Sequence, residues 1–227
     1  MSRGVVARST DLPPTWKSVL SVVAHPDDQY AGLGAVLDAF IYAGATVRVL
    51  CLTHGQTWTL DEAPGDLAAL RGVEMASAAD VLGATRAQLP VSLDGALNQV
   101  SLTRLAALVV AEAEAGHADG LLAFDTAGLT GHLDQVAATS AALVAAELVK
   151  LPVLGWTFPE TVAAQLNREF EAGVTRDRDK DIDLRVSFER VRQRLDSHAL
   201  LSQTLPDSAP RRRLQLLADS GCLRWLL

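Results

Sequence analysis

The sequence predicts an α/β protein, a Rossmann-like three-layer sandwich in which helices cover both faces of a mostly parallel sheet. Short apolar runs alternate with longer Ala-rich amphipathic stretches up to Phe158, the order typical of βαβ units. Polar clusters follow four of these apolar runs, and ligand sites in such sheets lie outside the carboxyl ends of the strands. The 227 residues include no Pro- or Gly-rich linker, so we predict one domain over residues 1–227.

The first part of the chain alternates regularly between the two kinds of element. The run "SVLSVVA" has strand length, "TVRVLCLT" is rich in β-branched residues, and Gly44 is a plausible stop for the helix before it. Strands are predicted at 18–24, 46–53, 85–91, 119–124 and 151–158, and helices at 32–44, 66–83, 101–116 and 132–149.

The rest of the chain departs from this alternation. Residues 168–188 are charged and then alternate between apolar and polar, which predicts an exposed loop that leads to an added strand. Helical spacing at 189–203 and 210–221 predicts two further helices. We therefore expect a C-terminal strand and helices added to the parallel sheet.

Composition excludes several classes of function. The net charge is −7 and no basic run is longer than residues 211–213, so we expect no nucleic-acid partner. No apolar run is long enough to span a bilayer or to form a signal peptide, which predicts no membrane span and a cytoplasmic location. Cys51 and Cys222 are interpreted as reduced thiols. The oligomeric state stays open, a homo-oligomer included.

Five motifs occur in order along the chain: "AHPDDQ" at 24–29, "LTHGQ" at 52–56, "LRGVEMASAADVLG" at 70–83, "LDGAL" at 93–97 and "TGHLDQVAAT" at 130–139. Together they resemble the PIG-L/LmbE family of metal-dependent N-deacetylases. The resemblance runs from about Leu20 to Phe158, and more loosely beyond. It implies a small-molecule substrate such as an N-acylated amino sugar, and a divalent metal, with zinc favoured.

The resemblance also implies roles for individual residues. His25 and Asp28 correspond to zinc ligands, and Asp27 corresponds to the general base on the metal-bound water. His132 corresponds to the group that stabilises the oxyanion or protonates the leaving amine, and Asp134 to a residue that orients its neighbours.

Three further positions correspond to substrate contacts: Arg71, Asp94 and His54. Their ordinary structural interpretations are a solvated charge on a helix for Arg71 and a turn residue for Asp94. His54 is assigned to the pocket rim rather than to the metal. His117 and His198 have no matching partners and are interpreted as solvent-facing.

The chemistry of these residue types agrees with the resemblance. A zinc ion with three protein ligands and an open position lowers the pKa of bound water to about 7. A neighbouring carboxylate accepts that proton, and a histidine across the site serves the oxyanion or the leaving nitrogen. The "HPDD" and "GHLD" motifs taken singly would also fit capped helix starts, but their pairing favours function.

The sequence departs from the family pattern at three positions. Gln29 and Gln56 replace glutamates, and Gln135 replaces the histidine that would be the third metal ligand. An amide oxygen is a weak donor compared with imidazole and is not a usual zinc ligand. Three alternatives follow: Gln135 ligates a weakly bound metal, His54 supplies the missing imidazole, or the metal is absent.

The leading hypothesis is therefore a hydrolase that removes an acyl group from an amide nitrogen. Its first rival is a metal-free or catalytically altered member of the family, which binds an acylated metabolite or performs other chemistry. Its second rival is an interaction module, which the acidic composition permits but does not indicate.

Overall fold

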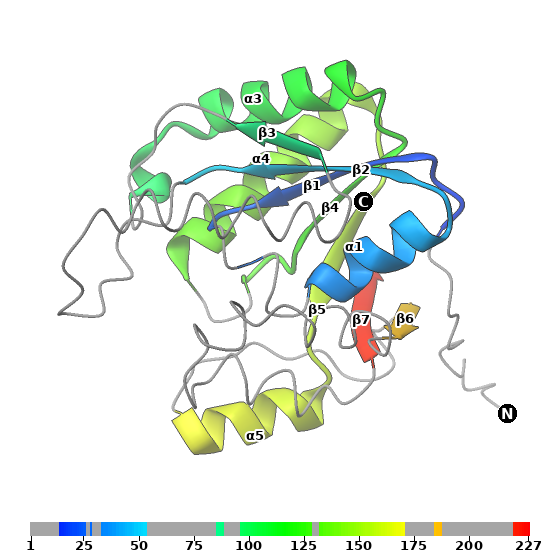
Figure 1. The fold of residues 1–227 in the computed structure, drawn as a ribbon. Helices are drawn as coiled ribbons and strands as arrows, with labels where there is room; N and C mark the ends of the chain where they lie inside the picture. Colours follow the sequence, from blue (N-terminus) through cyan, green and yellow to red (C-terminus); the bar gives the residue numbers. More distant parts are fainter. Residues whose placement is uncertain are drawn as a thin grey trace, which may run out of the picture.

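The sheet of this protein is mostly parallel and its strands run in the order β3-β2-β1-β4-β5-β7-β6 (Figure 1). The computed structural model describes residues 14–25, 28, 33–53, 85–88, 96–128, 132–170, 184–187 and 220–227. β1 to β5 are parallel, whereas β7 runs antiparallel to both β5 and β6. The strands are β1 (Ser18–Val23), β2 (Thr46–Cys51), β3 (Thr85–Gln88), β4 (Gly120–Phe124), β5 (Val153–Thr157), β6 (Leu184–Ser187) and β7 (Ser220–Trp225).

Helices lie on both faces of the sheet, as predicted (Figure 1). α3 (Leu102–Ala115) and α4 (Leu133–Val149) pack on each other and on β1, while α1 (Leu33–Tyr42) packs against β2, β6 and β7 from the other face. Two apolar clusters result: one joins α3 and α4 to the sheet, and the other joins α1 to it. The buried faces of these helices exclude water from the sheet and so supply the main stabilising term of the fold.

The strand order reverses direction at β1. The chain moves from β1 to β2 and β3 on one side, and then returns to place β4 on the other side of β1. Val19 pairs with Gly120 and Ser21 with Leu122, so β1 and β4 are direct neighbours. Such a switch point opens a crevice outside the carboxyl ends of the two strands. Residues 24–25 and 125–128, which follow β1 and β4, lie at this edge of the sheet.

Most of the predicted strands and helices are confirmed within the described residues. Both cysteines are buried, and neither forms a disulfide within the described residues. None of the helices in the described part of the chain has the length and apolarity that crossing a membrane requires. The predicted helices at 66–83 and 189–203 lie outside the described residues.

Two elements correct the prediction. Residues 168–170 belong to the end of helix α5 (Glu160–Phe170), not to a loop. Val162, Ala163 and Leu166 are buried at helical spacing, but the charged residues after them hide this pattern. Residues 220 and 221 begin β7 instead of ending a helix, because pairing with β5 and β6 overrides the local helical spacing.

Candidate metal centre

The candidate site lies where β1 and β4 end. Asp28 closes a tight turn after β1, since its backbone N–H donates to the carbonyl of His25 over 3.2 Å. Its carboxylate folds back on the strand end: Oδ2 accepts the backbone N–H of Ala24 (3.1 Å) and of His25 (2.8 Å). Aspartate is suited to this place because its short side chain satisfies backbone donors that the sheet leaves unpaired. The buried carboxylate is thereby fixed beside the ring of His25.

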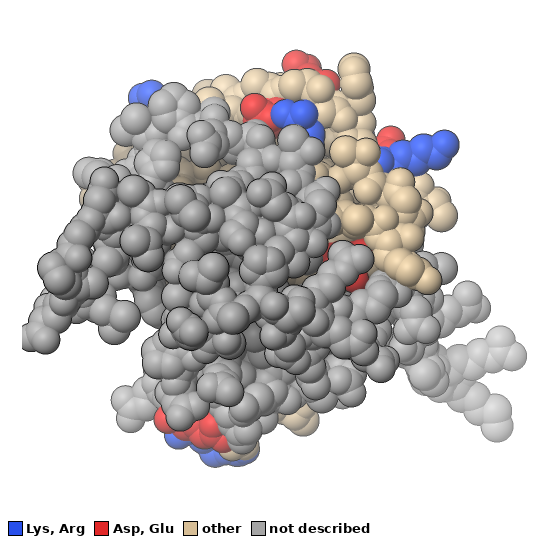
Figure 2. Space-filling view, in the orientation of Figure 1, with Lys and Arg blue, Asp and Glu red and all other residues tan. Residues whose placement is uncertain are grey.

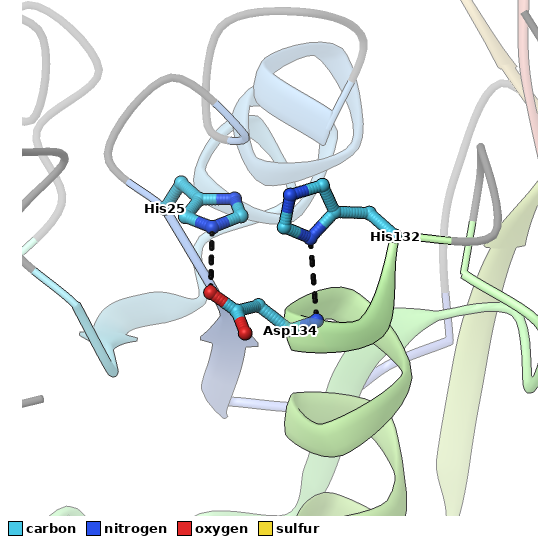
Figure 3. Close-up of side chains that lie close together, drawn as sticks. All are labelled: His25, His132 and Asp134. Carbon is cyan, nitrogen blue, oxygen red and sulfur yellow. Dashed lines mark hydrogen bonds and ion pairs between the residues drawn. The ribbon is translucent and has the colours of Figure 1, made fainter. Parts of the chain in front are cut away.

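The other half of the site is the first turn of α4. His132 is the N-cap of this helix, and its Nδ1 accepts the backbone N–H of Asp134 over 3.2 Å (Figure 3). A neutral imidazole with an acceptor at Nδ1 carries its proton on Nε2. Helix capping therefore sets the tautomer of His132 and leaves its Nε2–H available to a proton acceptor.

Asp134 joins the two halves. Its carboxylate is fully buried: Oδ1 accepts the backbone N–H of Leu97 over 3.0 Å, and Oδ2 lies 3.2 Å from Nε2 of His25 (Figure 3). A carboxylate on one ring nitrogen of a histidine fixes the ring orientation and the tautomer. The neutral ring of His25 then donates from Nε2 and keeps its lone pair on Nδ1, which lies 3.7 Å from Oδ2 of Asp28.

Gln135 contacts Asp28 directly. Its Nε2 donates to Oδ1 of Asp28 over 2.8 Å, and both side chains are buried. The Asp28 carboxylate thus accepts from the Gln135 amide as well as from the two backbone N–H groups. The amide presents its NH₂ group to Asp28, whereas metal ligation would require its carbonyl oxygen to face the same point.

Two overlapping groups of side chains could hold a divalent cation. The first is the family group, in which the side chains of His25, Asp28 and Gln135 meet. The second consists of His25, His132 and Asp134, whose ligand atoms lie within 4.8 Å of one another. Imidazole nitrogen and carboxylate oxygen are ordinary zinc ligands, so the donors present fit such an ion. The family group fits it only if the Gln135 amide rotates.

Several predicted site residues lie outside the described part of the chain: Asp27, His54, Arg71 and Asp94. His198 also lies outside it, and His117 is exposed, as expected. On the face shown in Figure 2, described basic and acidic side chains lie near one another and form no basic patch.

Sequence reasoning missed a buried polar group at the end of β4. Asp125 directly follows β4, is buried, and pairs with Arg224 of β7 and with Thr157 of β5. The position of Asp125 at a strand end was a usable signal in the sequence. Arg224 gave none, because β7 was not predicted.

Comparison with protein families identifies one match. The model of the family PIG-L, described as GlcNAc-PI de-N-acetylase, matches residues 20–146. These residues run from β1 into α4 and include both halves of the site. No curated protein sequence matches the chain.

Solved structures share the fold. An N,N'-diacetylchitobiose deacetylase from Pyrococcus horikoshii superposes with a TM-score of 0.67 at 18% identity, covering 93% of this chain and 84% of that one. A deacetylase of teicoplanin biosynthesis gives a TM-score of 0.61 at 16% identity, covering 92% and 98%. GalB, the 4-carboxy-2-hydroxymuconate hydratase from Pseudomonas putida KT2440, gives 0.59 at 17% identity, covering 93% and 96%. At these identities the likeness establishes the fold alone.

Proposed function

We propose a function from the premise that this chain belongs to the PIG-L family of de-N-acetylases. The chain is a metal-dependent hydrolase that removes an acyl (acetyl) group from the amide nitrogen of an amino sugar or a related small metabolite. One observation carries the proposal: His25 is held by Asp134 through Nε2, so that Nδ1 and the Asp28 carboxylate lie on the same side of the ring. This arrangement is the carboxylate–histidine pair that supports metal ligation.

We assign the cation to His25, Asp28 and Gln135, with zinc favoured. When bound, such an ion would polarise the acyl carbonyl and lower the pKa of a water molecule. Asp27 accepts the proton of the attacking water, whose oxygen adds to the acyl carbon. His132 assists collapse by donating a hydrogen bond from Nε2–H to the oxyanion or the departing nitrogen. The proton held by Asp27 passes to that nitrogen, and the C–N bond breaks to give the carboxylic acid and a free amine. Asp134 orients His25.

The substrate contacts are assigned to the pocket rim. Arg71, Asp94 and His54 are proposed to bind the sugar or its equivalent through hydrogen bonds. The deacetylases among the solved structures act, by their titles, on chitobiose and teicoplanin compounds. An N-acetylated sugar, free or conjugated, is therefore the first substrate class to test.

The experiment measures acetate and free amine released from a panel of N-acetylated amino sugars, together with the zinc content of the purified protein. Asp27→Asn should abolish turnover and leave zinc content unchanged, because the residue acts on the water and does not hold the ion. Asp119 is an exposed carboxylate at the opposite end of β4, and Asp119→Asn is the matched control. Full activity in Asp27→Asn would show that Asp27 is not the base.

A second candidate function has its own supporting observation. The hydrogen bond from Gln135 to Asp28 satisfies the carboxylate without any cation. This favours a family member that binds an acylated metabolite without hydrolysing it, or that performs other chemistry. The solved structures that share this fold include, by their titles, a hydratase as well as deacetylases. Purified protein that lacks zinc, takes up none on addition and releases no acetate would support this candidate over the first.

A further inference from the structure

Asp125 connects β4, which it follows directly, to β5 and β7. Its backbone N–H donates to the carbonyl of Trp156 over 2.9 Å, which continues the pairing of β4 with β5. Its Oδ1 accepts the backbone N–H of Thr126 (2.6 Å) and pairs with the Arg224 guanidinium, while Oδ2 accepts the hydroxyl of Thr157 (3.1 Å). Burying a carboxylate is costly unless it is paired and hydrogen-bonded, so these contacts are needed to keep Asp125 in place.

A short turn leads from Asp125 to the candidate metal centre. The carbonyl of Asp125 accepts the N–H of Gly128 over 2.8 Å, and Gly128 has φ +66°, a conformation that side chains disfavour. A Cβ added to Gly128 would lie 3.2 Å from Cβ and 3.4 Å from Oε1 of Gln135. The backbone of the turn therefore packs directly against the Gln135 side chain, whose other side donates to Asp28.

We propose that Arg224 is a positioning residue for the candidate metal centre. By pairing with Asp125 it fixes the turn at 125–128, and through Gly128 it holds the side chain at position 135 against Asp28. Arg224 lies on β7, outside residues 20–146 that the family model matches. The inference rests on the proposed function for what the site does, but its geometry requires neither metal nor substrate.

Amide hydrogen exchange on the metal-free protein tests the inference without any assay of activity. Arg224→Ala should speed the exchange of the Thr126, Gly128 and Asp134 amides by about tenfold or more, the effect of losing a charged hydrogen bond. Arg224→Lys should restore much of the protection, because the positive charge is kept.

The matched control is Arg48→Ala. Arg48 of β2 pairs with Glu112 of α3 over 2.8 Å, and its side chain is 26% exposed against 27% for Arg224. This variant loses a comparable ion pair away from the turn, so the three amides should keep their wild-type exchange rates. General destabilisation would instead raise exchange in both variants and throughout β1 and β2.

Asp125→Asn provides a second, independent arm. If Arg224 acts through Asp125, the double variant Asp125→Asn with Arg224→Ala should exchange these amides no faster than the more strongly affected single variant does. Unchanged exchange at these amides in Arg224→Ala, or the same rise in Arg48→Ala, would overturn the proposal. Absence of acetate release from every substrate would overturn the proposed function and leave these exchange results as they are.

Discussion

Replacing Gln135 by histidine should turn a weak cation site into a strong one. The amide that donates to Asp28 over 2.8 Å is exchanged for an imidazole that can offer a lone pair to the same point. Loss of a residue that only supports a ligand typically lowers metal affinity by roughly 10–100-fold. Gain of a ligand should therefore raise zinc affinity by about 100-fold or more.

This gain in affinity can be expressed as stability. A ligand present at 100 times its Kd stabilises the native state by about 2.7 kcal/mol. For a chain of 227 residues, about 1 kcal/mol raises Tm by roughly 2–4 °C, so added zinc should raise the Tm of Gln135→His by roughly 5–10 °C. In chelator the same variant should be less stable than the wild type, by at most about 1.5–3 kcal/mol, because the hydrogen bond to a charged group is lost.

The assay is thermal unfolding of wild type, Gln135→His and Gln135→Ala, each in chelator and in zinc. Gln135→Ala controls for loss of the amide without gain of a ligand. Zinc should raise its Tm by no more than it raises the Tm of the wild type. An equal response to zinc in Gln135→His and wild type would refute the reasoning, because residue 135 would then not face the ion.

Three further predictions concern the candidate site and the start of β4. His132→Ala should lower turnover by roughly 10²–10⁴-fold, the usual contribution of an acid or base, and leave zinc affinity unchanged; loss of zinc binding would assign the ion to the group that includes His132. The Asp119 carboxylate accepts the backbone N–H groups of Lys17 and then Ser18, which lowers its pKa. Its contribution to stability is thus present above its unfolded-state pKa and disappears as pH falls through the lower folded pKa, so Asp119→Asn should flatten the acid limb of a stability-against-pH curve measured with urea. Gly120→Ala should cost about 1–3 kcal/mol in urea unfolding, because the new Cβ would lie 2.4 Å from the Trp16 ring.

The parallel strands and the meeting point of the motifs could be predicted because both depend on local signals. Apolar runs of strand length set β1 and β4, and the carboxyl ends of neighbouring parallel strands must lie at one edge of the sheet. His25 and Asp28 could therefore be expected near His132 and Gln135, although their catalytic and ligand roles stay predictions.

The rest depends on contacts that no local pattern encodes. β7 is held as a strand by partners on both sides, and its own residues did not indicate it. The pairing of Arg224 with Asp125 follows from that strand and was equally invisible. The direction of the Gln135 amide is set by a carboxylate whose other oxygen already accepts two backbone N–H groups. Sequence spacing could place this amide near Asp28 but could not say which of its ends would face the carboxylate.

The adjacency of β1 and β4 bears on how proteins of this architecture could diversify. His25 follows β1 and His132 caps α4, which follows the neighbouring strand β4, although the chain between β1 and β4 passes through β2 and β3. Insertions or deletions in that intervening stretch can lengthen, shorten or rewrite the connections without shifting these two histidines relative to each other. Evolution can therefore change the connecting segments while inheriting one rigid pair of neighbouring strands.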